Sequence, residues 1–580
     1  MFKFRRTTKP EDLDKKLVLS LVQNRLPSWK QFRLFPTLLN PRERWIMRAA
    51  SGLLIIACAI LLTNFLKRHI VQIPRDGGIY REGLVGSPRL INPILGTSDT
   101  DRDIARLIYA GLLRYNGEGI LEGDLAEHFT IEDAGREVRF TLRNNAVFHD
   151  GEPVRASDVV FTIEAIRNQA WRSPLWRSFQ DVTIESPDEH TVIAKSKAVL
   201  PSFPSLFTVG ILPKHIWAGI DPQIADRAVW NLKPIGAGPY QFNSLAKSRD
   251  GEIVSYKLTR ASRYHHGNPY LKEIVLELFP DFESALDAVK SHTTDGMSFV
   301  PERLRAKVST SDLRMYRASF PRATGLFFQD RRSEFLRESA VRKALQYAID
   351  RSAIAALVPQ SIPTVLPFFE GQIGYTKSVA IPQQNQDAAR AELKGAGWTS
   401  QDGGWVKNNK RLTLTLTTLD EPIHLQVVSA IKQSWEQIGI GVRLEAAPRV
   451  TFEREVLRPR AYEVLLFSIL SNNDPDPYVF WHSSQIDDPG LNLGSIRVRA
   501  IDSLLEQGRA TIDPRARGRA YLEFGQRFQE EIPAILLYSS SYAYAVRTRI
   551  HGIHLTAIAT PADRFNMIYQ WYTRSRLGWK

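Results

Sequence analysis

The sequence predicts an α/β protein with more than one lobe, preceded by a single membrane-spanning helix. Three observations support this fold class. Predicted strands and helices alternate along most of the chain, as is typical of α/β architectures. The chain has 580 residues, of which 43% are hydrophobic, and this is enough for more than one core. One uninterrupted apolar run, residues 49–66, stands near the N-terminus.

The apolar run predicts a transmembrane helix over residues 46–66. Residues 49–66 contain no charged side chain, and Lys67 and Arg68 follow them. At about 1.5 Å per residue, a helix of this length spans roughly 27 Å, close to the hydrocarbon thickness of a bilayer. Trp45 lies on the near side, at a depth that an indole ring prefers. A buried core helix is the alternative, but core helices rarely have such one-sided flanking charges.

The flanking charges orient this helix. The first 48 residues contain twelve Lys or Arg and four acidic residues, whereas the formal net charge of the whole chain is +14. By the positive-inside rule, the N-terminus is cytoplasmic and the chain after about residue 67 lies outside, as a single-pass protein of the cell membrane. We expect residues 1–45 to be a basic cytoplasmic leader, either amphipathic on membrane lipid or partly disordered. The weakly basic remainder offers no concentrated surface for nucleic acid, so we expect no such partner.

The only cysteine, Cys58, lies inside the apolar run. The triplet Ala57-Cys58-Ala59 has the small residues of a signal-peptidase site, and residues 55–58 resemble a lipobox. The apolar run continues past both positions to Leu66, and the basic leader is long for a signal peptide. We favour an uncleaved anchor, with a lipid-modified Cys58 as the alternative. The large part of the chain can have neither a disulfide nor a cysteine-ligated metal site.

Hydrophobic periodicity predicts the elements of the large part. We expect helices over residues 101–113, 282–290, 342–351 and 423–438, and a helix beginning at residues 157–161. We expect strands over residues 138–143, 182–186, 191–195, 253–258, 274–279, 325–329, 412–417, 442–446 and 464–469. Gly439 is expected to end the helix over residues 423–438.

Motifs for catalysis are absent from the sequence. His149-Asp150 invites a metal-hydrolase interpretation, but no second His/Asp pair stands at a useful spacing nearby and the neighbours fit a hairpin turn. The glycine-rich residues 234–240 lack the ending of a phosphate-binding loop. We find neither a Gly-x-Ser-x-Gly nor a His-Glu-x-x-His sequence, so a secreted hydrolase is disfavoured. We therefore expect no enzyme activity, no catalytic residue, no cofactor and no metal site.

The order of several longer motifs resembles one family. They read LINPILGTSDT with IYAGLLRYNGEG, VRFTLRNNAVFHDGEPVRASDVVFTIEAI, GILPKHIW, PIGAGPYQF, ASRYHHGNPYLKEIVLELFPD, SAVRKALQYAIDRSAI, VVSAIKQSWEQIGIGVRL and NNDPDPYVFWHSS. Together they cover roughly residues 76–550. In this order they resemble the family 5 extracellular solute-binding proteins, which are the dipeptide-, oligopeptide- and nickel-binding receptors of ABC importers.

The resemblance implies a two-lobed fold like that of periplasmic binding proteins (type II, cluster C) with an extra small domain. Lobe I would comprise residues 74–115, 229–318 and 541–580, the extra domain II residues 116–228, and lobe III residues 319–540. Such a receptor would bind a peptide or similar small solute between its lobes and deliver it to the permease and ATPase subunits of an ABC transporter. The alternative is a tethered sensor or scaffold that keeps the fold without transport, which the long leader favours.

The resemblance also implies a ligand site, with one departure. In peptide-binding members, an aspartate ahead of an Asp-Pro-Asp-like turn holds the ligand's N-terminal amine, and Ser471 stands at that position here. A serine hydroxyl cannot supply the charge for a strong ammonium contact. Asp474 or Asp476 could substitute, or the turn could be purely structural. Further candidates, placed by position alone, are Tyr478, Trp481, Thr97, Ser98, Asp99, Phe328 and Gln329; for the two rings, packing in the core is an open alternative.

Overall fold

The computed structural model describes residues 40–308, 311–359, 361–471 and 474–579, so the predicted leader lies outside the described residues except for its last few positions. The described chain forms two units. The body comprises Arg75–Arg574, and residues 40–74 form the other unit with residues 575–579. We describe each unit by itself.

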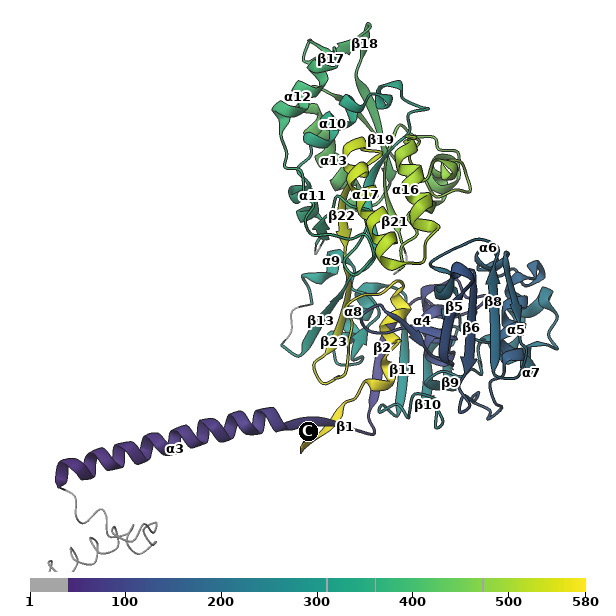
Figure 1. Cartoon of the computed structure of the whole chain (residues 1–580), viewed down its shortest axis with the longest axis vertical. Helices are drawn as coiled ribbons and strands as arrows, with labels where there is room; N and C mark the ends of the chain where they lie inside the picture. Colours follow the sequence, from purple (N-terminus) through teal and green to yellow (C-terminus); the bar gives the residue numbers. More distant parts are fainter. Residues whose placement is uncertain (1–39, 309–310, 360, 472–473, 580) are drawn as a thin grey trace, which may run out of the picture. The chain divides into compact units, whose positions relative to one another are not determined.

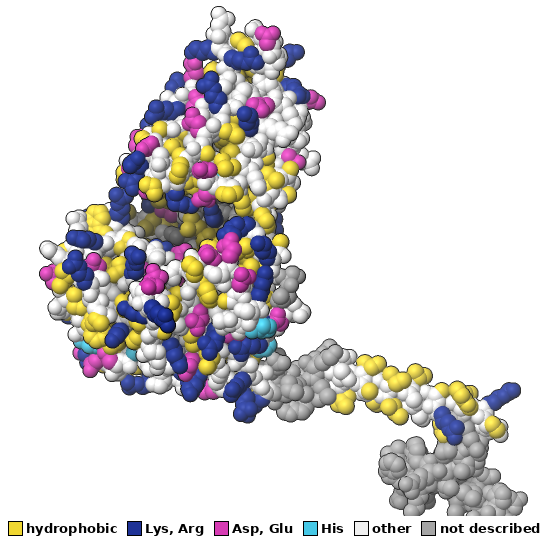
Figure 2. Space-filling model, turned by 180° about the vertical axis from the view of Figure 1, so that it is seen from behind, with side chains coloured by type: hydrophobic (Ala, Val, Ile, Leu, Met, Phe, Trp, Pro, Cys, Tyr) yellow, Lys and Arg dark blue, Asp and Glu magenta, His cyan; other side chains and the backbone are white. Residues whose placement is uncertain are grey.

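The smaller unit is dominated by α3 (Pro41–His69), which contains the predicted membrane helix. Its stretch Pro41–Phe65 is long and apolar enough to cross a membrane. Leu53, Leu54 and Ile55 are each more than half exposed, and Figure 2 shows hydrophobic side chains along the helix. A helix that is apolar on every side is typical of a lipid-facing segment. β1 (Ile70–Arg75) follows it and pairs with β24 (Arg574–Trp579) near the C-terminus.

The first lobe of the body is built on a seven-stranded sheet (Figure 1). Side chains of β23 alternate between its two faces, as strand geometry requires. Tyr544 and Val546 enter one core, whereas Ala543 and Ala545 pack on the opposite face against α8 (Phe282–Lys290), which has the predicted bounds. In sheet order, the strands are β13 (Leu313–Ala318), β23 (Tyr542–Arg547), β12 (Gly296–Met297), β2 (Ile79–Val85), β11 (Glu273–Phe279), β10 (Ile253–Arg260) and β9 (Tyr240–Lys247).

The second lobe is built on a six-stranded sheet with helices on both faces (Figure 1). Along its central strand β14, Leu326 and Phe328 enter the core under α10–α13, whereas Ala323 and Phe327 face the core of α16 and α17. Strands buried on both faces read as continuous apolar runs. In sheet order, the strands are β15 (Ser361–Pro363), β22 (Ala534–Ser540), β14 (Arg322–Phe328), β21 (Val464–Leu470), β19 (Thr413–Leu419) and β20 (Gly441–Ala447).

We call residues 116–228, the segment predicted as the extra domain, the small module; it contains a four-stranded antiparallel sheet in the order β5-β6-β8-β7. Phe140 of β6 and Val192 of β8 are fully buried in its core. Its strands are β5 (Ala126–Glu132), β6 (Glu137–Leu142), β7 (Val182–Glu185) and β8 (Thr191–Ser196), with α5 (Ala156–Arg167) beside them, and β3 (Leu113–Tyr115) pairs with β4 (Leu121–Gly123) at its entrance.

The remaining α-helices and strands of the body pack against these sheets or lie at their edges. They are α4 (Asp99–Ile108), α6 (Trp176–Phe179), α7 (Lys214–Trp217), α9 (Glu302–Arg305), α10 (Ser339–Tyr347), α11 (Arg351–Leu357), α12 (Gln386–Gly395), α13 (Pro422–Glu436), α14 (Arg449–Thr451), α15 (Tyr478–Trp481), α16 (Arg499–Arg509), α17 (Pro514–Glu531), and the three-stranded sheet of β16 (Thr399–Gln401), β17 (Gly404–Lys407) and β18 (Lys410–Arg411).

Two short connections join the large sheets. The chain passes from β13 to β14 through residues 319–321, and from β22 to β23 through Ser541 alone. The Arg305 guanidinium donates hydrogen bonds to the carbonyl oxygens of Ser541 and Pro359, each at 2.8 Å, and so fixes one connection. Both connections coincide with predicted lobe boundaries, although the division into three domains stays a prediction.

Three predicted helices end earlier than their periodicity indicates, and the one expected over residues 423–438 ends at Glu436. The helix expected over residues 342–351 is two helices, α10 and α11, because the Asp350 side chain accepts a hydrogen bond from the Ala353 amide and starts a new helix. The helix expected over residues 101–113 ends at Ile108. Just beyond it, a Cβ on Gly111 would lie 2.8 Å from the backbone of Thr208, so the chain there runs close against another segment.

Candidate functional site

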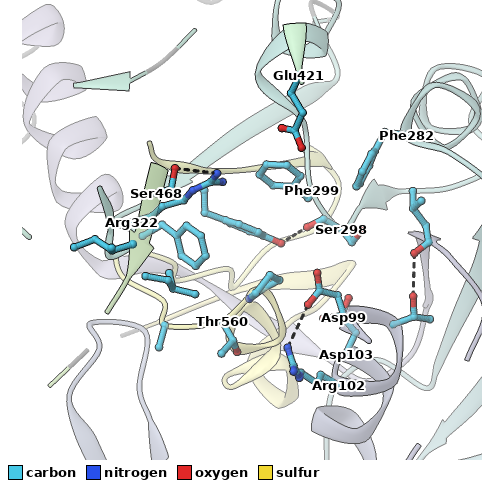
Figure 3. Close-up of a pocket in the computed structure, with 18 of the residues that line it drawn as sticks. Asp99, Arg102, Asp103, Phe282, Ser298, Phe299, Arg322, Glu421, Ser468 and Thr560 are labelled. Atoms are coloured by element: carbon cyan, nitrogen blue, oxygen red, sulfur yellow. Dashed lines mark hydrogen bonds and ion pairs between the residues drawn. The ribbon is translucent and has the colours of Figure 1, made fainter. Parts of the chain in front are cut away.

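A cavity of about 480 Å³ lies between the two large sheets of the body. It opens at the carboxyl ends of β2, β19 and β21, which is where open α/β sheets bind ligands. Figure 3 shows the lining side chains converging from both lobes, and Figure 2 shows a hollow between the lobes on that face of the molecule. The first lobe contributes Leu84, Asp99, Arg102, Asp103, Phe282, Ser298, Phe299 and Thr560, and the second Leu419, Glu421, His424, Arg449 and residues 467–470; Phe320, Arg322 and Tyr542 lie at or beside the connections.

One wall of the cavity is aromatic. Phe299 lies with its ring centroid 5.9 Å from that of Phe282 and 5.6 Å from that of Tyr542. The Tyr542 hydroxyl donates a hydrogen bond to the carbonyl oxygen of Ser298, which fixes the ring. Phe320 also packs against Tyr542, at 6.3 Å between centroids. This wall offers apolar contact without an exposed hydroxyl donor, so it suits the uncharged parts of a solute.

Charged side chains line the rest of the cavity, and most of them are paired within the protein. Arg102 lies 3.6 Å from Asp99, and Arg449 lies 2.5 Å from Glu421. Arg322 differs, because its guanidinium contacts only the Ser468 hydroxyl, at 3.4 Å, and has no carboxylate partner among the described residues. Figure 3 shows Arg322 and Ser468 side by side at the cavity. An arginine without an internal partner at a cleft is suited to an anionic group of a ligand.

A buried ionic network supports the cavity from below. Asp103, at the cavity floor, receives two hydrogen bonds from Arg564, at 2.8 and 2.7 Å. The same guanidinium donates to Glu82 at 3.1 Å, and Tyr80 and Tyr544 also donate to that carboxylate. Burial raises the pKa of Glu82 to about 7, although the Arg564 charge opposes the shift. The network holds β2, α4 and the segment after β23 together, so the floor is preorganised.

Two further cavities continue the cleft. One of about 450 Å³ shares Arg102, Ala559 and Thr560 with the central cavity and extends towards the small module. Another of about 440 Å³ shares residues 467–470 and is lined by Arg177 of the small module and Leu491 of the second lobe. The first of these cavities therefore lies between the first lobe and the small module, and the second lies where the small module meets the second lobe.

Of the residues predicted around the first loop, the structure places Asp99 in the cavity lining. Thr97 and Ser98 are exposed just ahead of α4 and do not line it. The Ser98 hydroxyl instead caps α4, since it accepts from the Asp101 amide at 3.0 Å.

The two aspartates of the predicted turn pair with arginines of their own lobe. Asp474 forms an ion pair with Arg517, and Asp476 lies 3.0 Å from Arg509. Burial raises the pKa of Asp476, against the charge of Arg509. Neither side chain lines the described cavities, so the geometry favours the structural interpretation of this turn over a role for Asp474 in binding an amine.

The aromatic candidates beside this turn also pack within the lobe. Trp481 is 5% exposed, stacks on Phe327 at 5.8 Å and meets Phe528 edge-on at 4.7 Å. Tyr478 stacks on His482 with centroids 4.1 Å apart. Trp481 thus lies in the core of this lobe and Tyr478 packs against that core, which favours the packing alternative for both rings.

Ser471 lies beside one of the connections. Its amide donates to the carbonyl oxygen of Pro321 at 2.7 Å, and the preceding Leu470 lines the central cavity. Phe328 and Gln329 are buried at the other end of β14 from Arg322 and lie outside the cavity lining. A strand rises about 3.3 Å per residue, so these two residues lie roughly 20 Å from the site.

His149, which the sequence singled out, binds backbone. Its Nε2 lies 3.0 Å from the Gly238 carbonyl oxygen, and its Nδ1 accepts from the Gly236 amide at 3.3 Å. Burial lowers the pKa of His149 to about 4. The ring is thus a structural clamp on the glycine-rich segment.

The sequence missed the residues that shape the cavity most. Arg322, Ser468, Glu421 and Phe299 belong to no motif. What they share is their place relative to the strands. Arg322 and Ser468 lie in strands and Glu421 follows one, and these strands meet the cleft at a carboxyl end or at a connection between the lobes. The rule for carboxyl ends of strands could have indicated Glu421 and Ser468, but no sequence pattern indicates which strands meet in space.

Comparison with known proteins decides the family. The profile of the bacterial extracellular solute-binding proteins, family 5 (middle region), matches residues 121–488. The chain belongs to this family. The family 5 match thus covers the small module and most of the second lobe.

Relatives of this family 5 protein span nearly its whole body. The oligopeptide-binding protein AppA of Bacillus subtilis is 24% identical over 491 residues, which cover 83% of this chain and 89% of AppA. The structure of AppA in complex with a nonapeptide is similar, with a TM-score of 0.66, 23% identity, and coverage of 86% and 99%. NikZ of Campylobacter jejuni in complex with Ni(L-His) is also similar, with a TM-score of 0.68, 22% identity, and coverage of 85% and 99%.

Proposed function

We propose that this protein is a membrane-held solute receptor of an ABC importer that binds a peptide or a similar small solute between its lobes. The observation that carries the proposal is the cavity of about 480 Å³, lined from both large sheets in a chain of family 5. Only two short connections join those sheets, which suits opening and closing about a hinge.

The site supports a ligand with a carboxylate or another anionic group. Arg322 would contact that group, since it has no carboxylate partner among the residues described. The aromatic wall around Phe299 would hold an apolar side chain. The neighbouring cavities of about 450 and 440 Å³ would give room for further residues of a peptide, and the related AppA of B. subtilis is named for oligopeptides.

Ligand binding would work by closure rather than by chemistry. A ligand that touches both lobes favours the closed form by the difference between its affinities for the closed and open forms. No covalent step is needed, so we assign no catalytic residue. The closed, loaded body would then be the form recognised by the permease, whose identity this chain does not specify.

Attachment to the membrane through α3 is the second part of the proposal. α3 has the length and composition of a membrane span, and its flanking arginines lie towards the N-terminus, as expected for a cytoplasmic end. The body from Arg75 onwards would then lie outside the cytoplasm, near the permease. A cleaved signal or a lipid on Cys58 would place the body in the same compartment.

Native mass spectrometry of the full chain, purified from cells in mild detergent, tests this function. We expect the protein to carry solutes of peptide mass, which dissociate on activation and are depleted in the Arg322→Gln variant. Protein that never carries a solute, and that binds none from a peptide mixture, would contradict the proposal.

A tethered sensor or scaffold is the second candidate, and Ser471 favours it. The serine removes the charge that peptide-binding relatives would place near the ligand's amine, and Asp474 is engaged by Arg517. Uptake of the co-purified solute by cells that lack this gene separates the two functions. Lost uptake supports the importer receptor, whereas normal uptake with a loaded protein supports the sensor.

A further inference from the structure

A second polar cluster lies outside the cleft, where the segment between β4 and β5 meets the turn after β10. Asp124 comes from the first segment, and His265 and His266 from the second. The Asp124 Oδ1 lies 2.7 Å from the His265 Nε2 and 3.1 Å from the His266 Nε2. One ligand atom from each of the three side chains falls within 4.8 Å of the other two.

Asp124 is a buried carboxylate held between two imidazole rings. It is only 6% exposed, and within the described ranges its ion pairs are with the two histidines alone. Arg114 is the cation nearby; its guanidinium lies 2.8 Å from Glu122, donates to the hydroxyl of Tyr569 at 3.1 Å and also acts electrostatically on Asp124. Buried charges in proteins are typically paired or bound to a metal ion.

The donor set and its access also fit a metal ion. Two imidazole nitrogens and one carboxylate oxygen are typical ligands of Zn²⁺ and related ions, at about 2.0–2.2 Å. In tetrahedral geometry such ligands lie about 3.3 Å apart, so the two distances from the Asp124 carboxylate to the imidazole nitrogens need to lengthen by only a few tenths of an ångström. The His266 side chain is 15% exposed, which leaves a path for the ion and a position for water as fourth ligand.

We propose that Asp124, His265 and His266 form a binding site for one divalent transition-metal ion, such as Zn²⁺ or Ni²⁺. The ion joins the entrance of the small module to the turn after β10 in the first lobe, so its role is to fasten these two segments. The site is separate from the cleft and independent of the proposed function. It revises our expectation from the sequence that no metal site exists, because Asp124 lies too far along the chain from the histidines for any spacing rule.

The test is calorimetric titration of the full chain in detergent with ZnCl₂ and, separately, NiCl₂, after chelator treatment. We expect one ion to bind with micromolar or tighter affinity and to raise the melting temperature. His265→Asn and His266→Asn should each weaken binding more than tenfold, since even outer-shell changes cost 10–100-fold in some metal sites. Failure to bind at micromolar concentrations, or binding that survives both substitutions, would overturn the proposal.

A matched control exists in the same chain. His215 also contacts an aspartate, Asp150, at 2.7 Å, but it belongs to no three-ligand group in the described part of the chain. His215→Asn should leave binding unchanged; an equal loss there would contradict the site. If a variant at His265 fails to fold, titration of the native chain with Co²⁺ decides whether these three side chains bind a metal ion. A tetrahedral visible spectrum at one equivalent supports the site, and an octahedral spectrum contradicts it.

Discussion

At the residue scale, Arg322 is the side chain on which ligand chemistry depends most. We expect Arg322→Gln to weaken binding of a carboxylate-bearing peptide by about tenfold or more, because hydrogen bonds to charged groups contribute about 1.5–3 kcal/mol. Titration calorimetry with a co-purified peptide and its C-terminal amide measures the effect. The amide should bind both proteins equally.

The control for Arg322 is Arg449, which lines the same cavity but pairs with Glu421 at 2.5 Å. Arg449→Gln should change affinity far less. If both substitutions weaken binding equally, or neither does, Arg322 is not the contact for the ligand's anion.

Ser471 carries a second prediction. If it stands where relatives hold a ligand's amine, Ser471→Asp should raise affinity for peptides with a free N-terminus, because a carboxylate strengthens an ammonium contact. N-acetylated peptides should gain nothing, and Ser471→Asn, which has similar size without charge, serves as control. Unchanged affinity in the aspartate variant would mean that the ligand's amine lies elsewhere.

Glu82 predicts how stability depends on pH. Its pKa rises from 4.5 to about 7 on folding, so the folded protein binds more protons than the unfolded chain between these values. The free energy of unfolding therefore falls by on the order of 3 kcal/mol as pH rises from about 4.5 to 7. Above pH 7 the contribution of this group no longer changes.

Urea unfolding between pH 5 and 8 measures this effect. Glu82→Gln should flatten the slope, whereas Glu127→Gln, a change at an exposed position, should not. An equal slope in wild type and Glu82→Gln would show that other groups set the pH dependence.

At the element scale, α13 ends at Glu436, two residues before the predicted end, and Gly439 takes a φ of +89° in the turn that follows. A Cβ there would also lie 3.1 Å from the Gly403 carbonyl oxygen. We expect Gly439→Ala to destabilise the protein by about 1 kcal/mol or more. Thermal unfolding measures it, with Gly219→Ala, where nothing lies within 4 Å, as control. Equal melting temperatures for the two variants would contradict the prediction that Gly439 is needed for its conformation.

Most elements could be predicted because their apolar periodicity is strong and local. α8 has its predicted bounds, and the strand expected over residues 464–469 is β21 with one more residue. Errors arose where a capping side chain or a close approach of backbone, rather than periodicity, ends a helix. Asp350 and Gly111 are the two cases.

The site was less predictable than the fold. Asp99, the first residue of α4, lines the cavity, and its contact with ligand stays a prediction. Asp474 and Trp481 lie near the right segment, but their partners Arg517 and Phe327 come from other elements, and no sequence pattern reveals such pairing. Arg322 lies within no motif, so only the junction of the two sheets identifies it.

At the scale of the whole molecule, the body is two sheet-based lobes joined by residues 319–321 and Ser541. Arg305 binds the Ser541 carbonyl, and Ser471 binds Pro321, so both connections are held by hydrogen bonds beside the cavity. A ligand seated there would contact Phe320, Arg322 and Tyr542, which flank the two connections. This arrangement is the basis for our central claim that the protein acts by closing on its solute.

Measuring the distance between two spin labels across the cleft tests that claim directly. Cys58 is replaced by serine, and cysteines are introduced at Gln180 and Leu491, which are exposed and lie near opposite walls of the cavity that Arg177 and Leu491 line. On saturation with a co-purified peptide, the distribution should shift to shorter distances, and Arg322→Gln should require more peptide for the same shift. A distribution that stays unchanged while calorimetry shows full occupancy would contradict the account.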